Sequence, residues 1–237
     1  MRENKNTTIK DALILCAITL VLGLVLAGVY EITKEPIEKA QAQNDKNACE
    51  QVISAVEGAS IGEGGEELAE KANEYLTLHR LGYSEEEGEV AEEASDSYSK
   101  YVQVQSVKEI TKDGKKAGYV FLADAKKGYG GKISFVMGEI QGVVTGLEIT
   151  SQSETAGLGA NCEKPAFKDK FSYENGIRYP KDDSLPMYYK AGTTPKDEGG
   201  QIEAMSGATV TSKGITNAIK GLLFYAKSLE REVETDE

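Results

Sequence analysis

The sequence predicts an α+β protein with a single N-terminal transmembrane helix, followed by one extracytoplasmic domain that has a small antiparallel sheet and a C-terminal helix. Three patterns predict this class. An uncharged apolar run occupies residues 12–30, short β-like segments begin at residue 101, and apolar residues at helical spacing lie near the C-terminus.

The apolar run is long enough to cross a membrane. Residues 12–30 are bracketed by Asp11 and Glu31. With a rise of about 1.5 Å per residue, a helix of this length spans roughly 30 Å, the thickness of the hydrocarbon core. A cleaved signal peptide is the alternative, but its apolar core usually has only about 7–15 residues. We therefore expect a retained, single-pass anchor in the cell membrane.

The orientation of this anchor depends on the basic residues near its two ends. Three basic residues lie on each side of the span: Arg2, Lys5 and Lys10 before it, and Lys34, Lys39 and Lys46 after it. The amino terminus adds one positive charge to the first group. This slight excess favours a cytoplasmic N-terminus, residues 1–11, and an exported main domain.

Two segments are expected between the anchor and the main domain. Residues 31–60 have apolar residues at helical spacing and predict a linker helix that extends the anchor after a break at Pro36. Residues 61–100 are expected to form an acidic, solvated insertion, because 11 glutamates lie between Glu63 and Glu93. The acidic run could bind a cationic partner, although such runs are usually exposed surfaces.

The main domain is predicted to span residues 101–231, with a tail at 232–237. Its β-like segments are residues 101–108, 118–123, 133–137 and 143–150. Asp113-Gly114 and residues 138–142 give the hairpin signals between them. Residues 151–200 are expected to form long connections, which are often functional. Residues 212–233 predict an amphipathic helix.

Charge and composition exclude several kinds of site. The formal net charge of -12 argues against nucleic acid as a partner. The three cysteines lie far apart and cannot supply four thiolates to an iron–sulfur cluster. The single histidine, His79, excludes a bis-histidine haem and a multi-histidine zinc site within one chain. Any electron carrier here must be organic. Nothing in the sequence places Cys49 and Cys162 together, so their pairing stays open.

A run of hydroxyl residues precedes the predicted C-terminal helix. Thr209, Thr211 and Ser212 follow closely behind Ser206. Unpaired N–H groups and the helix dipole stabilise a phosphate at a helix N-terminus, and Lys213 would add a positive charge. The alternative is that Thr211 or Ser212 simply caps the helix.

The run Ser206-Gly207-Ala208-Thr209-Val210-Thr211 resembles the flavinylation motif of the FMN-binding domain family. This family is found in the G subunit of Rnf complexes and in the C subunit of sodium-pumping NADH:quinone reductase. There, a flavin transferase uses FAD to join FMN through its phosphate to the last threonine. The resemblance implies covalent FMN on Thr211, with the other five residues binding the cofactor. Glu203 stands where the family usually has Asp.

A second block supports the resemblance. Residues 153–159, Ser-Glu-Thr-Ala-Gly-Leu-Gly, resemble the family's S/H-x-E-T-P-G-L-G loop, which lies against the isoalloxazine ring. Ala156 replaces the usual proline and relaxes one fixed φ angle. Residues 130–133 and 142–149 resemble the hairpin that leads into this loop. The resemblance implies five further cofactor-binding residues: Glu154, Thr155, Gly157, Leu158 and Gly159.

The resemblance also implies a function. A flavin accepts two electrons and releases them singly, so the protein needs no catalytic acid or base of its own. The implied role is a redox subunit of an ion-translocating ferredoxin:NAD⁺ oxidoreductase, the Rnf complex, and the implied partners are its other subunits. The short chain and the position of the anchor directly at its N-terminus favour the Rnf subunit over two alternatives, the quinone-reductase subunit and a stand-alone tethered flavoprotein. A non-redox alternative is a tethered binding or scaffold module in which residues 206–211 only cap a helix.

Overall fold

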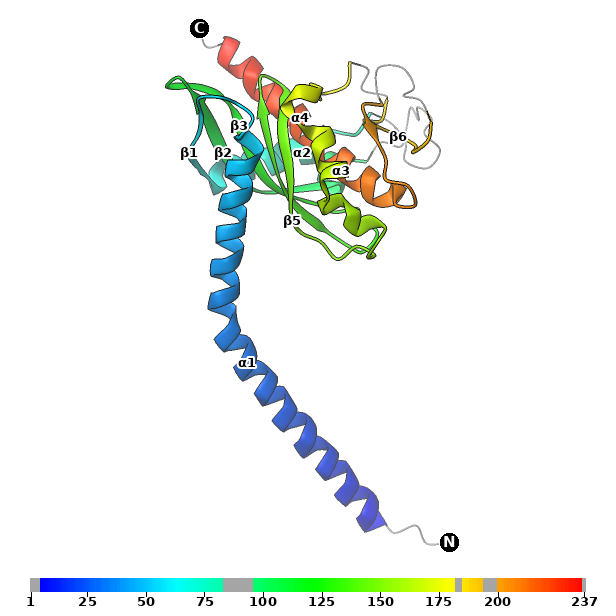
Figure 1. The fold of residues 1–237 in the computed structure, drawn as a ribbon. Coiled ribbons are helices and arrows are strands. Elements are labelled where there is room, and N and C mark those ends of the chain that lie inside the picture. Colours follow the sequence, from blue (N-terminus) through cyan, green and yellow to red (C-terminus); the bar gives the residue numbers. More distant parts are fainter. Residues whose placement is uncertain (1–4, 83–95, 182–184, 194–199, 236–237) are drawn as a thin grey trace. The chain divides into compact units, whose positions relative to one another are not determined.

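The computed structural model describes residues 5–82, 96–181, 185–193 and 200–235. By its internal contacts the chain divides into two compact units, residues 1–44 and 45–237. The described part of the first unit is helical and belongs to α1, while the second unit contains the end of α1, the sheet and the remaining helices (Figure 1). The α+β class, with one long apolar N-terminal helix, an antiparallel sheet and a C-terminal helix, is confirmed.

Helix α1 spans Lys5–Ile53. Its apolar stretch is long enough to cross a membrane, and large aliphatic side chains from Ile9 to Ile32 are exposed. A break was predicted at Pro36, but the helix continues through this residue. A proline inside a helix removes one backbone hydrogen bond. The helix surface around Pro36 is exposed, so water can satisfy the carbonyl that loses its partner.

The sheet has five antiparallel strands in sequence order. They are β1 (Ala59–Gly65), β2 (Val102–Lys112), β3 (Lys115–Ala125), β4 (Ile133–Ile140) and β5 (Val143–Ser151). Two tight turns close hairpins with positive φ angles, at Asp113-Gly114 and at Gln141-Gly142. Both are the two-residue turns that match strand twist. The hairpin predicted at Asp113-Gly114 is therefore confirmed.

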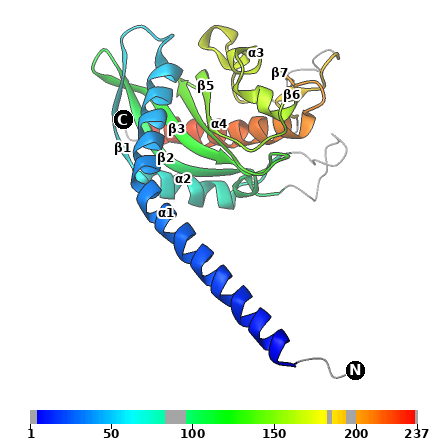
Figure 2. The same ribbon diagram turned by 60° about the horizontal axis from the view of Figure 1, so that its bottom comes forward.

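Each face of the sheet packs against a different set of helices. Helices α2 (Glu66–Leu78) and α4 (Thr209–Thr235) cover one face (Figure 2). Phe121, Phe135 and Met137 belong to the same buried cluster as the apolar side chains of α4. On the other face, the last turns of α1 pack against alternate residues of the same strands. The alternation follows from the two-residue period of a strand. Cys162 lies in the first cluster and Cys49 in the second, and both are free thiols.

Part of the expected acidic insertion belongs to the fold. Residues 59–65 pair with β2 as the edge strand β1, and residues 66–78 form α2, whose Ala69, Ala72 and Leu76 are buried. The interpretation as a solvated insertion is therefore wrong for these residues. The glutamates of α2 lie mainly on the exposed side of an amphipathic helix. The rest of the acidic run, residues 83–95, lies outside the described residues.

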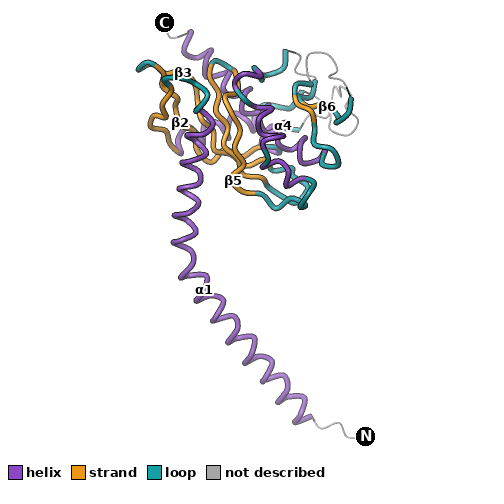
Figure 3. The backbone as a smooth tube through the Cα atoms, in the orientation of Figure 1, coloured by secondary structure: helices purple, strands orange, loops and turns teal. Residues whose placement is uncertain are grey.

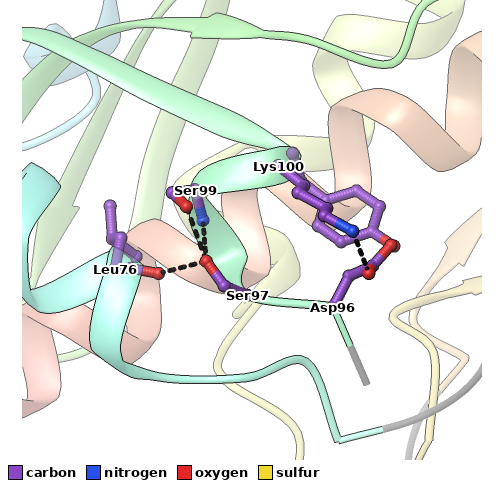
Figure 4. Close-up of polar contacts among 6 residues, drawn as sticks. Leu76, Asp96, Ser97, Ser99 and Lys100 are labelled. Atoms are coloured by element: carbon purple, nitrogen blue, oxygen red, sulfur yellow. Dashed lines mark hydrogen bonds and ion pairs between the residues drawn. The ribbon is translucent and has the colours of Figure 1, made fainter. Parts of the chain in front are cut away.

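A small polar junction fixes the chain just after that run. Ser97 Oγ donates a hydrogen bond to the carbonyl oxygen of Leu76 at 3.2 Å and accepts one from the Ser99 N–H (Figure 4). Lys100 pairs with Asp96 beside it. These contacts join the short helix η1 (Tyr98–Lys100) to the end of α2. His79 stacks on Tyr75 in the same region, with 3.9 Å between ring centroids.

Where the structure describes it, outside residues 182–184 and 194–199, the segment between β5 and α4 is mostly loop, as predicted for residues 151–200 (Figure 3). Its short elements are η2 (Gly159–Glu163), α3 (Pro165–Lys168), η3 (Asp169–Phe171), η4 (Tyr173–Asn175), β6 (Tyr188–Tyr189) and β7 (Ile202–Glu203). Strands β6 and β7 form a parallel pair just before α4. The helix α4 in turn contacts η2, which follows β5.

Candidate functional site

The two motifs singled out in the sequence line one cavity of about 510 Å³. Its walls come from the loop after β5, the first residue of η2, the first turn of α4 and the loop between β3 and β4. Its volume lies in the usual range for small-molecule sites. The lining residues are Tyr129, Glu154, Thr155, Leu158, Gly159, Gly207, Ala208, Thr209, Val210 and Thr211.

Nine of the eleven predicted site residues are among these lining residues. Gly157 is not, and instead makes a turn with φ +76° between Thr155 and Leu158. Ser206 lines a neighbouring cavity of about 410 Å³. A larger cavity of about 710 Å³ lies at the end of α1, among residues that neither motif includes.

Thr211 is held inside the first turn of α4. The helix begins at Thr209, three residues earlier than the sequence pattern predicts. Thr211 is 1% exposed, and its Oγ1 donates a hydrogen bond of 2.6 Å to Glu154 Oε2. Glu154 lies 57 positions earlier in the chain and is 8% exposed. The hydroxyl of Thr211 is therefore directed at a carboxylate.

Ser212, which the sequence offered with Thr211 as a helix cap, lies inside the first turn of α4 and bonds to residues that precede the helix. Its hydroxyl accepts a hydrogen bond from the Met205 N–H at 2.8 Å and donates one to the Ala208 carbonyl oxygen at 3.0 Å. Ser212 is fully buried. It thus ties the first turn of α4 to the segment before it, and its single hydroxyl proton is donated to the Ala208 carbonyl oxygen. Thr209, by contrast, is exposed.

Glycines leave the space that the Glu154 carboxylate occupies. A Cβ atom on Gly159 would lie 2.4 Å from Glu154 Oε2 and 2.6 Å from Thr211 Oγ1. A Cβ atom on Gly128 would lie 2.5 Å from Glu154 Oε1. The Gly130 N–H donates to that same oxygen at 2.8 Å. Since real Cβ atoms do not approach so closely, side chains at Gly128 and Gly159 would displace the carboxylate.

The cavity wall carries apolar groups that the chain itself leaves exposed. Tyr129 is 74% exposed, Val210 52% and Leu158 44%. Gly207, with φ +73°, brings the chain against Leu158 Cδ2. A flat ring could cover these three side chains, while a phosphate would lie at the N-terminus of the 27-residue helix α4. The cavity therefore suits a phosphate-bearing aromatic ligand.

Sequence reasoning missed two residues of the site: Tyr129, which lines the cavity, and Gly128, which leaves room for the Glu154 carboxylate. The signal was present, because Tyr129 is flanked by Gly128, Gly130 and Gly131 in a short turn between two strands. A large exposed aromatic residue between glycines is typical of a loop that approaches a ligand closely.

The segment that precedes the motif is held by Glu203. Lys170 Nζ donates to the Glu203 carbonyl oxygen at 2.9 Å and lies 3.6 Å from Oε2, while the Gly192 N–H donates to Oε1 at 3.1 Å. Glu203, which stands where the family usually has Asp, thereby joins β7 to two other loops.

Cys162 is buried within η2, the short helix whose first residue lines the cavity. Burial, followed by the charges of Glu163 and Glu154, raises the pKa of its thiol to about 12. The thiol therefore stays protonated at neutral pH and is a structural group.

Two family models match the chain, one at its N-terminus and one over most of its main domain. One, described as the RnfG N-terminal region, matches residues 1–52, and the other, described as the FMN-binding domain, matches residues 128–223. The second match spans every residue that lines the cavity.

Curated relatives agree with this match. The G subunit of a proton-translocating ferredoxin:NAD(+) oxidoreductase complex from Clostridium ljungdahlii is 36% identical over 46% of this chain and 53% of its own length. The G subunit of an ion-translocating oxidoreductase complex from Salmonella typhimurium is 29% identical over 52% of this chain and 56% of its own length. The G subunit of the complex from Haemophilus influenzae is 24% identical over 90% of this chain and 87% of its own. The chain spans about half the length of the first two relatives.

Two solved structures are also similar. Shewanella oneidensis NqrC has a TM-score of 0.42 at 20% identity, covering 64% of this chain and 67% of its own. The C subunit of Na(+)-translocating NADH-quinone reductase from Parabacteroides distasonis has a TM-score of 0.43 at 22% identity, covering 78% and 92%. The chain therefore matches the FMN-binding domain over residues 128–223, and in its N-terminal region and in this domain it is similar to G subunits of ion-translocating oxidoreductase complexes.

Proposed function

We propose that this chain is an electron-transfer subunit of a membrane-bound, ion-translocating ferredoxin:NAD⁺ oxidoreductase. In this proposal the chain carries electrons on FMN, whose phosphate is esterified to Thr211 Oγ1. The names of the curated relatives support the complex, and the FMN-binding domain match supports the cofactor. The match to residues 1–52 favours the Rnf type over the quinone-reductase type.

The choice of Thr211 as the attachment site rests on the environments of three neighbouring hydroxyl groups, those of Thr209, Thr211 and Ser212. Ser212 is engaged in the helix start, and Thr209 is exposed. Thr211 lines the cavity, and its hydroxyl donates a hydrogen bond to the carboxylate of Glu154, which also lines it. Its position in the first turn of α4 favours a phosphate, because unpaired N–H groups and the helix dipole stabilise negative charge there.

The residues present fit FMN. When bound, the flavin supplies the redox chemistry, taking two electrons and passing them on singly. The chain's residues position the ring: Tyr129, Leu158 and Val210 offer an apolar surface, and Gly159 allows the loop to approach Thr211. Attachment through a phosphoester would keep the cofactor from being lost outside the cytoplasm.

The proposal includes an extracytoplasmic main domain, a cytoplasmic N-terminus, other subunits of the complex as partners, and a flavin transferase for maturation. The exposed apolar surface of α1 supports anchoring in lipid. Orientation is tested with alkaline phosphatase or green fluorescent protein fused after Glu237. We expect phosphatase activity without fluorescence, whereas fluorescence without phosphatase activity would reverse the orientation.

The attachment is tested by in-gel fluorescence of membranes after denaturation in SDS. We expect a fluorescent band at the mass of this chain that disappears in Thr211→Ala and persists in Thr209→Ala, the matched control. An absent band in the wild-type protein from native membranes would contradict the covalent model. A band that persists in Thr211→Ala would move the acceptor to another hydroxyl.

A further inference from the structure

We infer that Glu154 is a catalytic residue for flavin attachment, the group that accepts the proton of Thr211 as its oxygen bonds to phosphorus. This inference rests on the proposed function, in which Thr211 is the acceptor. It gives the acceptor protein, and not only the transferase, a chemical part in its own modification.

The carboxylate is fixed in place for this role. Glu154 Oε2 receives the hydrogen bond from Thr211 Oγ1 at 2.6 Å, while Oε1 accepts from the Gly130 N–H at 2.8 Å. The Glu154 N–H donates to Gln152 Oε1 at 2.5 Å and holds the backbone of the loop. One oxygen therefore anchors the carboxylate, and the other faces the hydroxyl.

The arrangement also sets the direction of the hydroxyl. Thr211 has a single hydroxyl proton, and that proton lies on the bond to Glu154. The oxygen lone pairs must then point elsewhere, and Thr211 lines the open cavity. A general base must lie within hydrogen-bond reach of the proton that it removes, and this geometry satisfies that condition.

Burial strengthens the effect. Glu154 is 8% exposed and Thr211 1% exposed, so little water competes for the bond between them. Gly159 and Gly128 provide the room, since a Cβ atom on either would overlap the carboxylate. The contact thus depends on features of three separate segments, and a helix cap would require none of them.

The step balances with FAD as the second substrate. A bond forms between Thr211 Oγ1 and the phosphorus atom of the FMN half of FAD. The bond from that phosphorus to the bridging oxygen of the pyrophosphate breaks, and AMP leaves. The Thr211 proton passes to Glu154 and from there to solvent. No electrons are transferred in the step.

The test measures attachment and not electron transfer. The full-length apo-protein in detergent is mixed with a flavin transferase and FAD, and covalent flavin and released AMP are followed with time. We expect Glu154→Gln to react about 100-fold more slowly than wild type, the lower end of the usual contribution of a general base. Glu174→Gln, the same change on an exposed residue of η4, should react at the wild-type rate.

A pH profile separates proton transfer from a purely structural role. The rate for wild type, divided by that for Glu154→Gln, should fall toward acid, because a protonated carboxyl group cannot accept the proton. Tyr129 lines the same cavity, so the series is repeated in Tyr129→Phe. Cys162 lies near enough to sense the charge of Glu154, but its pKa of about 12 keeps it neutral across this range.

Circular dichroism checks that Glu154→Gln is folded. If it is not, Glu154→Asp is measured in its place. The shorter carboxylate should keep the fall toward acid at a lower overall rate. Wild-type rates in folded Glu154→Gln, or a flat acid profile in Glu154→Asp, would overturn the inference. Failure of the proposed function looks different, because wild type would then gain no flavin or Thr211→Ala would still gain it.

Discussion

Gly159 lies so close to Thr211 that a Cβ atom on it would be 2.6 Å from Thr211 Oγ1. The same atom would lie 2.4 Å from Glu154 Oε2. The start of η2, the loop after β5 and the first turn of α4 therefore meet around the hydroxyl group of Thr211, without room for a methyl group.

Gly159→Ala should consequently reduce flavin attachment while destabilising the fold only moderately. Overpacking a well-packed site costs about 1–3 kcal/mol, and the added methyl group must displace either the carboxylate or the hydroxyl. In-gel fluorescence per mole of folded protein measures the first effect, and thermal unfolding the second.

Gly65→Ala is the matched control for this substitution. A Cβ atom on Gly65 meets nothing closer than 3.9 Å, so flavin content should not change. Full flavin content in Gly159→Ala would show that the close contact has no part in the site.

Tyr129→Ala should change the environment of the bound flavin without unfolding the protein. Tyr129 is 74% exposed, so its ring contributes little to the core, yet it lines the cavity. Aromatic pairs contribute about 0.5–1.5 kcal/mol beyond area burial. We expect brighter flavin fluorescence in the native state, because a stacked tyrosine quenches it, and a melting temperature close to wild type. Tyr173→Ala, on η4, is the control. Identical fluorescence in all three proteins would place the ring away from Tyr129.

Gly146→Ala should destabilise the domain without touching the cavity. A Cβ atom on Gly146 would lie 3.0 Å from Val52 Cα and 3.1 Å from its carbonyl oxygen, where the end of α1 packs on the sheet. Because these are backbone atoms, Val52→Ala would not relieve the clash. The melting temperature should fall, and flavin content per folded molecule should stay at the wild-type level. An unchanged melting temperature would mean that the end of α1 does not pack tightly on β5.

Cys162 should be nearly inert in the folded protein. Its pKa is raised from 9.0 to about 12, chiefly by burial, so at a given pH below 9.0 the thiolate fraction is about 1,000-fold smaller than in the unfolded chain. The neutral thiol favours the folded state fully below pH 9.0. This contribution to the free energy of unfolding changes only as the pH rises from 9.0 toward about 12, where the unfolded chain ionises first and the folded state loses stability. Alkylation of Cys162, followed by mass spectrometry in native and denaturing conditions, measures the contrast. Equal rates in the two conditions would contradict the burial.

Much of the fold follows from local patterns in the sequence. The anchor is a long apolar run, the hairpin at Asp113-Gly114 has the required turn residues, and α4 has a clear amphipathic period. Strand β1 was hidden, because Ala-Ser-Ile-Gly-Glu-Gly-Gly carries few β-forming residues and is a strand only through its pairing with β2.

The site was predictable in its members but not in its contacts. Resemblance to a known motif pointed to Thr211 and to the loop that holds Glu154, but no pattern predicts a hydrogen bond between residues 57 positions apart. The start of α4 at Thr209 was missed for a similar reason. β-Branched residues lower helix propensity there, and the bond from Met205 to Ser212 is a contact that spacing does not reveal.

The most direct test of the account is the mass of the tryptic peptide of residues 197–213, which ends at Lys213 and contains Thr211. It is to be recovered from protein that matured in its native membrane. The account predicts this peptide with one added FMN phosphoryl group, and fragmentation that assigns it to Thr211. An unmodified peptide, or FMN on any other residue, would contradict it.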